Sequence, residues 1–200
     1  MDNNYSRIIR KNLQTLYTHD LNARAHAMGA QLTGEQLSFK AFGSMCRICS
    51  TAIHLDGQKQ TGPLGIILSL YSLHAGEQPV ELEPLKAFKE FPDSMPYVGA
   101  FASHTEQILT NAVAQIITNR QRIIEVMDGD EAPAQISADS AMVVRPLPKI
   151  SLCYIFYEAD DDFPAAATCL FSNNANRHMP MDGLADVGEY TSRALLDLVK

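Results

Sequence analysis

The stretch Ile150–Asp182, ISLCYIFYEADDDFPAAATCLFSNNANRHMPMD, decides the fold of this chain. Two runs of β-forming residues, 150–157 and 165–171, flank an acidic break, and the second run leads through a polar turn into a helix. The first run is apolar on both faces apart from Ser151, which is typical of a central strand that is covered on both sides. The stretch therefore predicts a β-hairpin at the centre of a sheet.

The residues before this hairpin predict helices and further strands around it. Apolar residues recur at three- and four-residue steps over 5–28, and again over 81–91 and 101–127, which predicts amphipathic helices. Alternating apolar residues predict a strand pair over 37–55 and one strand over 141–147. We expect one α+β domain, in which an antiparallel sheet of about five strands, including the 37–55 pair, is covered by long amphipathic helices. The domain 1–200 then comprises the N-terminal helix 5–28, a helical middle 63–127, and a C-terminal sheet and helix 141–199.

The composition bounds the partners and the compartment. The net charge is −7 with a pI near 5.3, and the 16 Lys and Arg residues are scattered, which argues against a nucleic-acid partner. The start, MDNNYSRIIRK, lacks the apolar core of a signal peptide, and no apolar run is long enough to span a membrane. We therefore expect a cytoplasmic protein that has no membrane partner and whose four Cys residues are reduced thiols or metal ligands.

Cysteines provide the first candidate metal site. Cys46 and Cys49 form a CxxC motif inside a predicted strand, where residues three apart face opposite sides, so a shared metal would need a bulge there. In the central hairpin, Cys153 and Cys169 each lie eight residues from Asp161, which predicts that they stand opposite one another on one face. Metal or dithiol chemistry and ordinary packing of small apolar side chains both remain open.

The acidic break and the polar turn after the hairpin are two further candidate sites. Asp160 and Asp162 belong to a run of crowded carboxylates that either stays solvated or binds a cation, and the EF-hand pattern is absent. The turn SNNANRH precedes a helix N-terminus, where anionic ligands commonly bind, although its Asn residues could equally satisfy their own backbone. The candidate ligand-binding residues are Asn173, Asn174, Asn176, Arg177 and His178, together with His104, which falls on or beside the apolar stripe of the predicted helix 101–127.

Three segments carry a resemblance to a known family: GIILSLYSLHAG, PYVGAFASHTEQIL, and PLPKISLCYIFYEADDDFPAAATCLFSNNANRHMPMDGLADVGE. They resemble the family of uncharacterised proteins that share the domain of unknown function 3786, which occurs mainly in anaerobic bacteria and archaea. Some relatives resemble fusions with an iron-sulfur module. The resemblance therefore implies an accessory role, with a redox or one-carbon metabolism protein as partner.

No catalytic signature is present in the chain, and the sequence names no cofactor. We therefore expect a non-catalytic binding or accessory protein, linked through the resemblance to anaerobic redox, metal or corrinoid-dependent one-carbon metabolism. The first alternative is a metal-assisted or thiol-dependent enzyme that uses residues such as Cys46, Cys49, His104, Asp160 or His178. The second alternative is a structural homodimer, in which homo-oligomerisation is itself the function.

Overall fold

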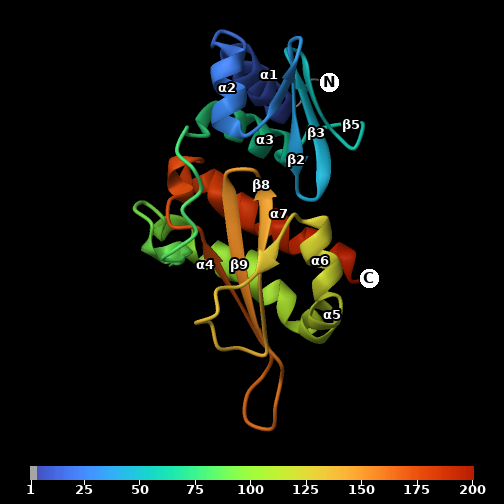
Figure 1. The fold of residues 1–200 in the computed structure, drawn as a ribbon, viewed down its shortest axis with the longest axis vertical. Helices are drawn as coiled ribbons and strands as arrows, with labels where there is room; N and C mark the ends of the chain where they lie inside the picture. Colours follow the sequence, from blue (N-terminus) through green and yellow to red (C-terminus); the bar gives the residue numbers. More distant parts are fainter. Residues whose placement is uncertain (1–3) are drawn as a thin grey trace.

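A computed structural model describes residues 4–200, which form two antiparallel five-stranded sheets surrounded by helices (Figure 1). The N-terminal part contains α1 (Asn4–Leu16), α2 (Leu21–Met28), β1 (Gln31–Thr33), β2 (Gln36–Ala41), β3 (Ser44–Cys49), β4 (Ala52–Leu55), β5 (Gln58–Lys59) and α3 (Pro63–His74). The remainder contains β6 (Lys86–Ala87), the 3-10 turns η1 (Phe88–Glu90) and η2 (Met95–Tyr97), α4 (Val98–Phe101), the π-helical turn η3 (Ala102–Glu106), the 3-10 helix η4 (Gln107–Ala112), α5 (Val113–Thr118), α6 (Arg120–Val126), β7 (Asp130–Glu131), β8 (Ser140–Leu147), β9 (Ile150–Tyr157), β10 (Ala166–Phe171), η5 (Ala175–Arg177) and α7 (Met181–Leu198).

The α+β class with antiparallel sheets of about five strands is confirmed, but the strands form two sheets rather than one. One sheet has the order β1-β2-β3-β4-β5, so the predicted 37–55 pair belongs to it, and the other has the order β6-β10-β9-β8-β7. The sheets meet where the amide of Phe42 donates to the carbonyl of Pro146 at 2.8 Å. Pro146 has no N–H to offer a neighbouring strand, and the β8–β9 pairing is irregular between Val144 and Leu147. A continuous ladder therefore does not pass from one sheet to the other.

The predicted N-terminal helix 5–28 is wrong as a single helix, because the chain turns after Leu16 and begins a second helix at Leu21. Asp20 is the N-cap of α2, and its carboxylate accepts from the amide of Asn22 at 2.9 Å. Both helices pack on α3, so the apolar residues before and after the break face the same partner. Periodicity therefore detected the buried face correctly and missed the turn.

The helical middle, 63–127, is also more broken than predicted. Residues 81–91 form no α-helix, because Pro84 interrupts the segment and only β6 and the short η1 turn follow it. The predicted helix 101–127 is a chain of short pieces from α4 to α6, whose buried residues still follow the apolar spacing. These short pieces allow the segment to bend around one face of the C-terminal sheet (Figure 1).

The C-terminal sheet has two differently covered faces. Helix α7 lies against one face, where the buried Tyr154 hydroxyl of β9 reaches Ser192 at 2.9 Å (Figure 1). On the other face, the 132–139 segment crosses the sheet, and the Tyr157 hydroxyl donates to the carbonyl of Ser137 at 3.1 Å. The predicted double cover of β9 is therefore present, with helices on one side and extended chain on the other.

The predicted opposition of Cys153 and Cys169 is wrong by one residue. Cys169 pairs with Tyr154, and Cys153 pairs with Leu170. Asp160 N donates to the carbonyl of Phe163 at 3.0 Å, so the turn is centred between residues 161 and 162 rather than on Asp161. A slip of one residue moves a side chain to the other face of the sheet, so the two thiols point in opposite directions.

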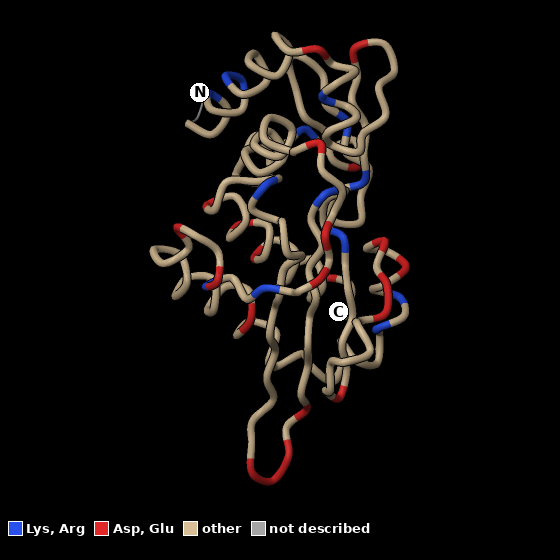
Figure 2. The backbone as a smooth tube through the Cα atoms, turned by 60° about the vertical axis from the view of Figure 1, so that its left-hand side comes forward, with Lys and Arg blue, Asp and Glu red and all other residues tan. Residues whose placement is uncertain are grey.

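Charged side chains are dispersed over the surface apart from the tip of the β9–β10 hairpin. Figure 2 shows that this tip projects from the body and is acidic, and that Lys and Arg are scattered along the chain. Phe163 at the tip is 70% exposed. Over residues 4–200, no helix combines the length and the apolar character that crossing a membrane requires.

Candidate functional site

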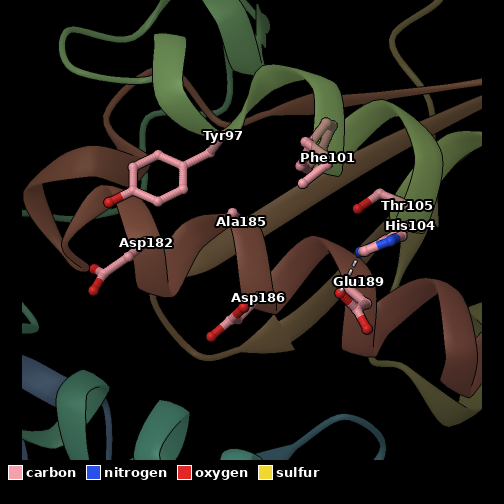
Figure 3. Close-up of a pocket in the computed structure, with 9 residues that line it drawn as sticks. Tyr97, Phe101, His104, Thr105, Asp182, Ala185, Asp186 and Glu189 are labelled. Carbon is pink, nitrogen blue, oxygen red and sulfur yellow. Dashed lines mark ion pairs between the residues drawn. The ribbon is translucent and has the colours of Figure 1, made fainter.

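The candidate site is a groove of about 180 Å³ between the α4–η3 segment and the first half of α7 (Figure 3). We call it the α4–α7 groove. One wall carries aromatic and small side chains, and α7 supplies carboxylates along the other. The residues that line it are Tyr97, Ala100, Phe101, His104, Thr105, Asp182, Ala185, Asp186 and Glu189.

Aromatic packing fixes the α4 wall of the groove. The ring of Phe101 stacks on Phe88 with centroids 4.4 Å apart, and it also contacts Phe171 of β10 at 5.6 Å. Phe91 packs edge-on against Phe171 at 5.8 Å. Rings of this size bury large areas and prefer such stacked and tilted arrangements. The cluster therefore anchors α4 to the sheet and holds Phe101 at the base of the groove.

Buried hydrogen bonds fix the position of η3 relative to α7. Ser192 of α7 donates to the carbonyl of Thr105 at 2.7 Å, and it lies 2.9 Å from the Tyr154 hydroxyl. Since the Ser192 hydrogen is used on Thr105, Tyr154 must be the donor in the second bond. All three residues are buried, and the chain of bonds joins β9, α7 and η3 into one unit.

The π-helical turn η3 divides its side chains between two directions. His104 and Thr105 face the groove, whereas Glu106 accepts from the amide of Cys169 on β10 at 3.0 Å. Burial raises the pKa of Glu106, although its bond to Cys169 and the nearby Lys89 oppose the shift. π-helical turns are rare and occur frequently at functional sites. Here the turn presents two polar side chains to α7 while the segment remains attached to the sheet.

Two side chains of the protein, His104 and Arg193, contact the carboxylate of Glu189 at one end of the groove. His104 Nδ1 lies 3.2 Å from one carboxylate oxygen of Glu189, and Arg193 lies 2.6 Å from the other. His104 is therefore paired inside the groove that it lines, as Figure 3 shows. The sequence places His104 on or beside the apolar stripe, and its side chain, which is 59% exposed, lies beside the buried residues of that stripe and not among them.

The other end of the groove contains two carboxylates without such partners. Among residues 4–200, neither Asp182 nor Asp186 has an ion-pair partner, and the carboxylate of Asp182 accepts from the amide of Gly183 at 2.8 Å. Partial burial raises the pKa of Asp186, and the neighbouring Glu189 and Asp182 raise it further. These two carboxylates, which have no ion-pair partner among the described residues, therefore make this end of the groove acidic.

One buried hydroxyl in the groove is unsatisfied. Thr105 has no exposed surface, and its Oγ1 has no hydrogen-bond partner among the described residues. Figure 3 shows the hydroxyl directed to the space between Phe101 and His104. Buried polar groups without a partner are uncommon in native proteins and call for an explanation such as a bound group. The Thr105 hydroxyl is thus an unsatisfied polar group buried beside the groove.

The turn SNNANRH lies outside this groove and connects to the 76–81 segment. Asn174 is buried, accepts from the amide of Glu81 at 3.0 Å and donates to the carbonyl of Pro79 at 2.8 Å. His178 is fully buried, and its Nδ1 accepts from the amide of Gly76 at 3.2 Å. Asn173 reaches the carboxylate of Glu81 at 3.5 Å, while Asn176 and Arg177 are exposed. Ligand binding by this turn stays a prediction.

The CxxC motif does not converge on one point. Cys46 is buried in the core of the N-terminal sheet, whereas Cys49 is partly exposed on the opposite face of β3, as the alternation predicts. Burial raises the pKa of Cys46 to about 12. Burial would also raise the pKa of Cys49, but hydrogen bonds from the side chain of Thr51 and from the backbone around Thr51 and Ala52 produce a net lowering.

The acidic hairpin tip uses part of its charge locally. One carboxylate oxygen of Asp160 accepts from the amides of Asp162 and Phe163, at 2.9 and 2.7 Å. Asp162 is exposed. In the described part of the chain, no three His, Cys, Asp or Glu side chains are grouped as a metal ion needs. A metal role for Cys46, Cys49, Asp160 or Asp162 stays a prediction.

Comparison with known proteins identifies the family. The family described as Domain of unknown function (DUF3786) matches residues 20–194 of the 200-residue chain. The chain belongs to this family. The DUF3786 match includes every residue that lines the α4–α7 groove. No curated protein and no solved structure matches the chain.

Sequence reasoning found His104 and missed the rest of the groove. Asp182, Asp186 and Glu189 follow one another at four- and three-residue steps, which places them on one face of a helix, and this signal was present in the sequence. Asp182 lies in the first turn of α7, two residues after the N-cap residue Pro180. The aromatic wall could not be found in this way, since it depends on how α4 crosses α7.

Proposed function

We propose that this DUF3786 protein is a non-catalytic binding or accessory protein whose α4–α7 groove takes up a small organic cation. The observation that carries the proposal is the juxtaposition of unpaired carboxylates on α7 with the aromatic rings of Tyr97 and Phe101. Carboxylates and aromatic faces together are the usual partners of ammonium and guanidinium groups. The unsatisfied hydroxyl of Thr105 adds a polar contact that fixes orientation.

The size and shape of the groove agree with a small ligand rather than a macromolecule. Its volume of about 180 Å³ is below the range of drug-sized pockets, which begins at about 300 Å³. Ala100 and Ala185 leave room between the two helices, and Tyr97 at the rim is 36% exposed. A compact cation can therefore enter from solvent and place its apolar part on small and aromatic side chains.

The proposed cellular setting comes from the sequence and the family resemblance. It is the cytoplasm of an anaerobe, with a role beside redox, metal or corrinoid-dependent one-carbon enzymes. The enzyme alternative stays a prediction. Of the residues predicted to serve such an enzyme, only His104 lines the α4–α7 groove. None of five pockets formed by the described residues contains three of the predicted residues. The homodimer alternative likewise stays a prediction, which a sizing column tests.

The test of cation binding is an NMR titration of isotope-labelled protein with 1-aminobutane and with tetramethylammonium. We expect saturable shifts of backbone signals from α4, η3 and the first half of α7, beyond those that sodium chloride of equal ionic strength produces. Ala185→Leu fills the groove without changing any charge and should abolish the saturable shifts. Ala114→Leu, on the exposed face of α5, is the matched control and should leave them unchanged.

Shifts equal to those from sodium chloride would contradict the proposal. So would saturable shifts that Ala185→Leu leaves intact, because the cation would then bind elsewhere on an acidic surface. Circular dichroism of both variants shows whether the added side chains preserve the fold.

A further inference from the structure

We infer that the ligand of the α4–α7 groove is a linear diamine, with one ammonium group on Asp182 and the second on Asp186. The inference rests on the proposed cation-binding function and names the class of cation. It begins from the arrangement of charge along α7, which differs between the two ends of the groove.

The carboxylates of α7 differ between the two ends of the groove: Glu189 has side-chain partners, whereas the pair at the other end has no ion-pair partner among residues 4–200. Glu189 has two side-chain partners in the protein, the imidazole of His104 at 3.2 Å and the guanidinium of Arg193 at 2.6 Å. Asp182 and Asp186 have no ion-pair partner in the part of the chain that the structure describes. A single cation in the groove would leave one of these two carboxylates uncompensated, whereas two linked cations would neutralise both.

The spacing of the two carboxylates fits two linked cations. Asp182 and Asp186 are four residues apart in α7 and project from the same side of the helix (Figure 3). Four residues rise about 6 Å along a helix, and like charges at this spacing repel one another. A four-carbon diamine is long enough to place one ammonium at each carboxylate. The shorter 1,2-diaminoethane is not, and it would bring its own two charges too close together.

The surface between the carboxylates suits an alkyl chain. Ala185 lies between the two aspartates on α7, and Ala100 and Phe101 face it from α4. These side chains offer apolar contact to methylene groups and no hydrogen-bonding group that would compete with the ammonium ends. The ring of Tyr97 lies at the Asp182 end of the groove (Figure 3), where its face can contact an ammonium group.

Helix geometry explains Asp182 only in part and does not explain Asp186. An acidic residue in the first turn of a helix is favoured by the helix dipole, and Asp182 is in the first turn of α7. Asp186 is one turn further on, where this effect has fallen away, and Glu189 and Asp182 on the same helix repel it. Thr105 lines the same groove near its Glu189 end, and its buried hydroxyl has no hydrogen-bond partner among the described residues, which is a second and independent sign of a ligand.

A divalent metal ion is the main competitor for the same two carboxylates. Over residues 4–200, no third His, Cys, Asp or Glu joins the pair as a ligand. Mg²⁺ or Mn²⁺ would therefore be held by two carboxylates and water, with the apolar surface and the Tyr97 ring unused. A diamine uses the carboxylates, the small side chains and the ring together.

The test is isothermal titration of the whole protein with 1,4-diaminobutane, 1-aminobutane, 1,2-diaminoethane and MnCl₂ at one fixed ionic strength. We expect 1,4-diaminobutane to bind about tenfold more tightly than 1-aminobutane or 1,2-diaminoethane, because its second ammonium binds intramolecularly. Asp182→Asn and Asp186→Asn should each reduce the affinity for 1,4-diaminobutane to that for 1-aminobutane. Asp161→Asn at the exposed hairpin tip removes the same charge elsewhere and should change nothing.

Each contrary outcome has a separate meaning. Equal affinities for 1,4-diaminobutane and 1-aminobutane, both lost in Ala185→Leu, would overturn the diamine and leave the cation-binding function standing. No binding of any amine would overturn both. If MnCl₂ displaces 1,4-diaminobutane and binds more tightly, the carboxylate pair is a metal site. If Asp161→Asn weakens binding as much as Asp186→Asn does, the diamine is responding to the net charge of −7 and not to the groove.

Discussion

Gly188 of α7 faces the ring of Phe101 of α4 so closely that a β-carbon on Gly188 would lie 2.5 Å from Cε2 of that ring. The same β-carbon would lie 3.1 Å from the hydroxyl of Thr105. Phe101 cannot move away, because it is stacked on Phe88 and packed against Phe171. The absence of a side chain at position 188 therefore sets the distance between the two walls of the groove.

We expect Gly188→Ala to destabilise the protein, because the new methyl group must push α7 away from the aromatic cluster. Overpacking of this kind costs about 1–3 kcal/mol, more than the helix propensity of alanine restores. The measurement is the free energy of unfolding in urea. Gly99→Ala in α4 is the control, because a β-carbon there meets nothing within 4 Å, and it should be neutral or mildly stabilising. Equal stability of both variants would show that α7 is not held against Phe101.

We expect Asp186→Asn to stabilise the protein at neutral pH. The pKa of Asp186 is raised by burial and by Glu189 and Asp182, so the folded protein holds this proton to a higher pH than the unfolded chain does. Stability is therefore lost as the pH rises through that window, and the cost is complete above it. Because the side chain is solvent-accessible, water screens the effect and the gain should stay below about 1 kcal/mol.

Urea unfolding at several pH values checks this prediction. The gain of Asp186→Asn should fade as the pH falls through the raised pKa of the folded state and then below the ordinary value of 3.8, where both states are protonated. Asp161→Asn changes the net charge equally on the exposed hairpin tip and serves as the reference. A loss of stability in Asp186→Asn would mean that the carboxylate makes a favourable contact. If Asp186→Asn gains stability and also binds 1,4-diaminobutane more weakly, then the aspartate at position 186 serves ligand binding at a cost in stability.

Local sequence patterns were sufficient for the strands of the C-terminal sheet and not for their register. The bounds of β8, β9 and β10 differ little from the predicted runs, since β-forming residues and proline mark them clearly. The register depended on the turn, which Asp160 tightens by accepting from two amides, and a sequence does not show where such a bond will form. One residue of error was enough to separate Cys153 from Cys169.

The groove was less accessible to sequence reasoning than the sheet. The spacing of Asp182, Asp186 and Glu189 predicts a shared helix face, but only the crossing of α4 and α7 brings Tyr97 and Thr105 to that face. The position of the π-helical turn that presents Thr105 depends on tertiary bonds such as that from Ser192 to the carbonyl of Thr105, which local sequence patterns do not reveal. The charge of a site can thus be predicted where its shape cannot.

We expect His178 to make the protein less stable in mild acid. Burial, with Lys149 next in importance, lowers the pKa of His178 below its ordinary value of 6.5. The neutral ring uses Nδ1 to accept from Gly76, and its Nε2 is buried without a partner among the described residues. The unfolded chain therefore takes up a proton that the folded protein resists. The contribution to stability is complete above pH 6.5 and is lost as the pH falls through the lowered value.

The check is the urea midpoint of His178→Asn between pH 7 and pH 5. Asn keeps an oxygen that can accept from Gly76 but does not titrate, so the midpoint should vary less with pH than that of the unmodified protein. His26→Asn changes an exposed histidine of α2 and should retain the original pH dependence. If the urea midpoint of His178→Asn varies with pH as steeply as that of the unmodified protein, the prediction is wrong.

We expect Cys49 to be the one thiol of the four that reacts readily in the folded protein. Burial opposes ionisation of Cys49, but its bonds with Thr51 and Ala52 outweigh it and lower the pKa, while the side chain remains partly exposed. Burial raises the pKa of Cys46 to about 12 and that of Cys153 to about 11, and it also raises the pKa of Cys169. Reactivity follows the thiolate, so both exposure and pKa favour Cys49.

Brief treatment with iodoacetamide, followed by peptide mapping, measures this selectivity. One label per chain on Cys49 is the expected result, and Cys49→Ser should remove it. Urea-unfolded protein should take up label at all four Cys residues, which controls for the reagent. Labelling of Cys46 at a comparable rate would mean that the N-terminal sheet opens on the timescale of the reaction, because Cys46 has no exposed surface in the fold.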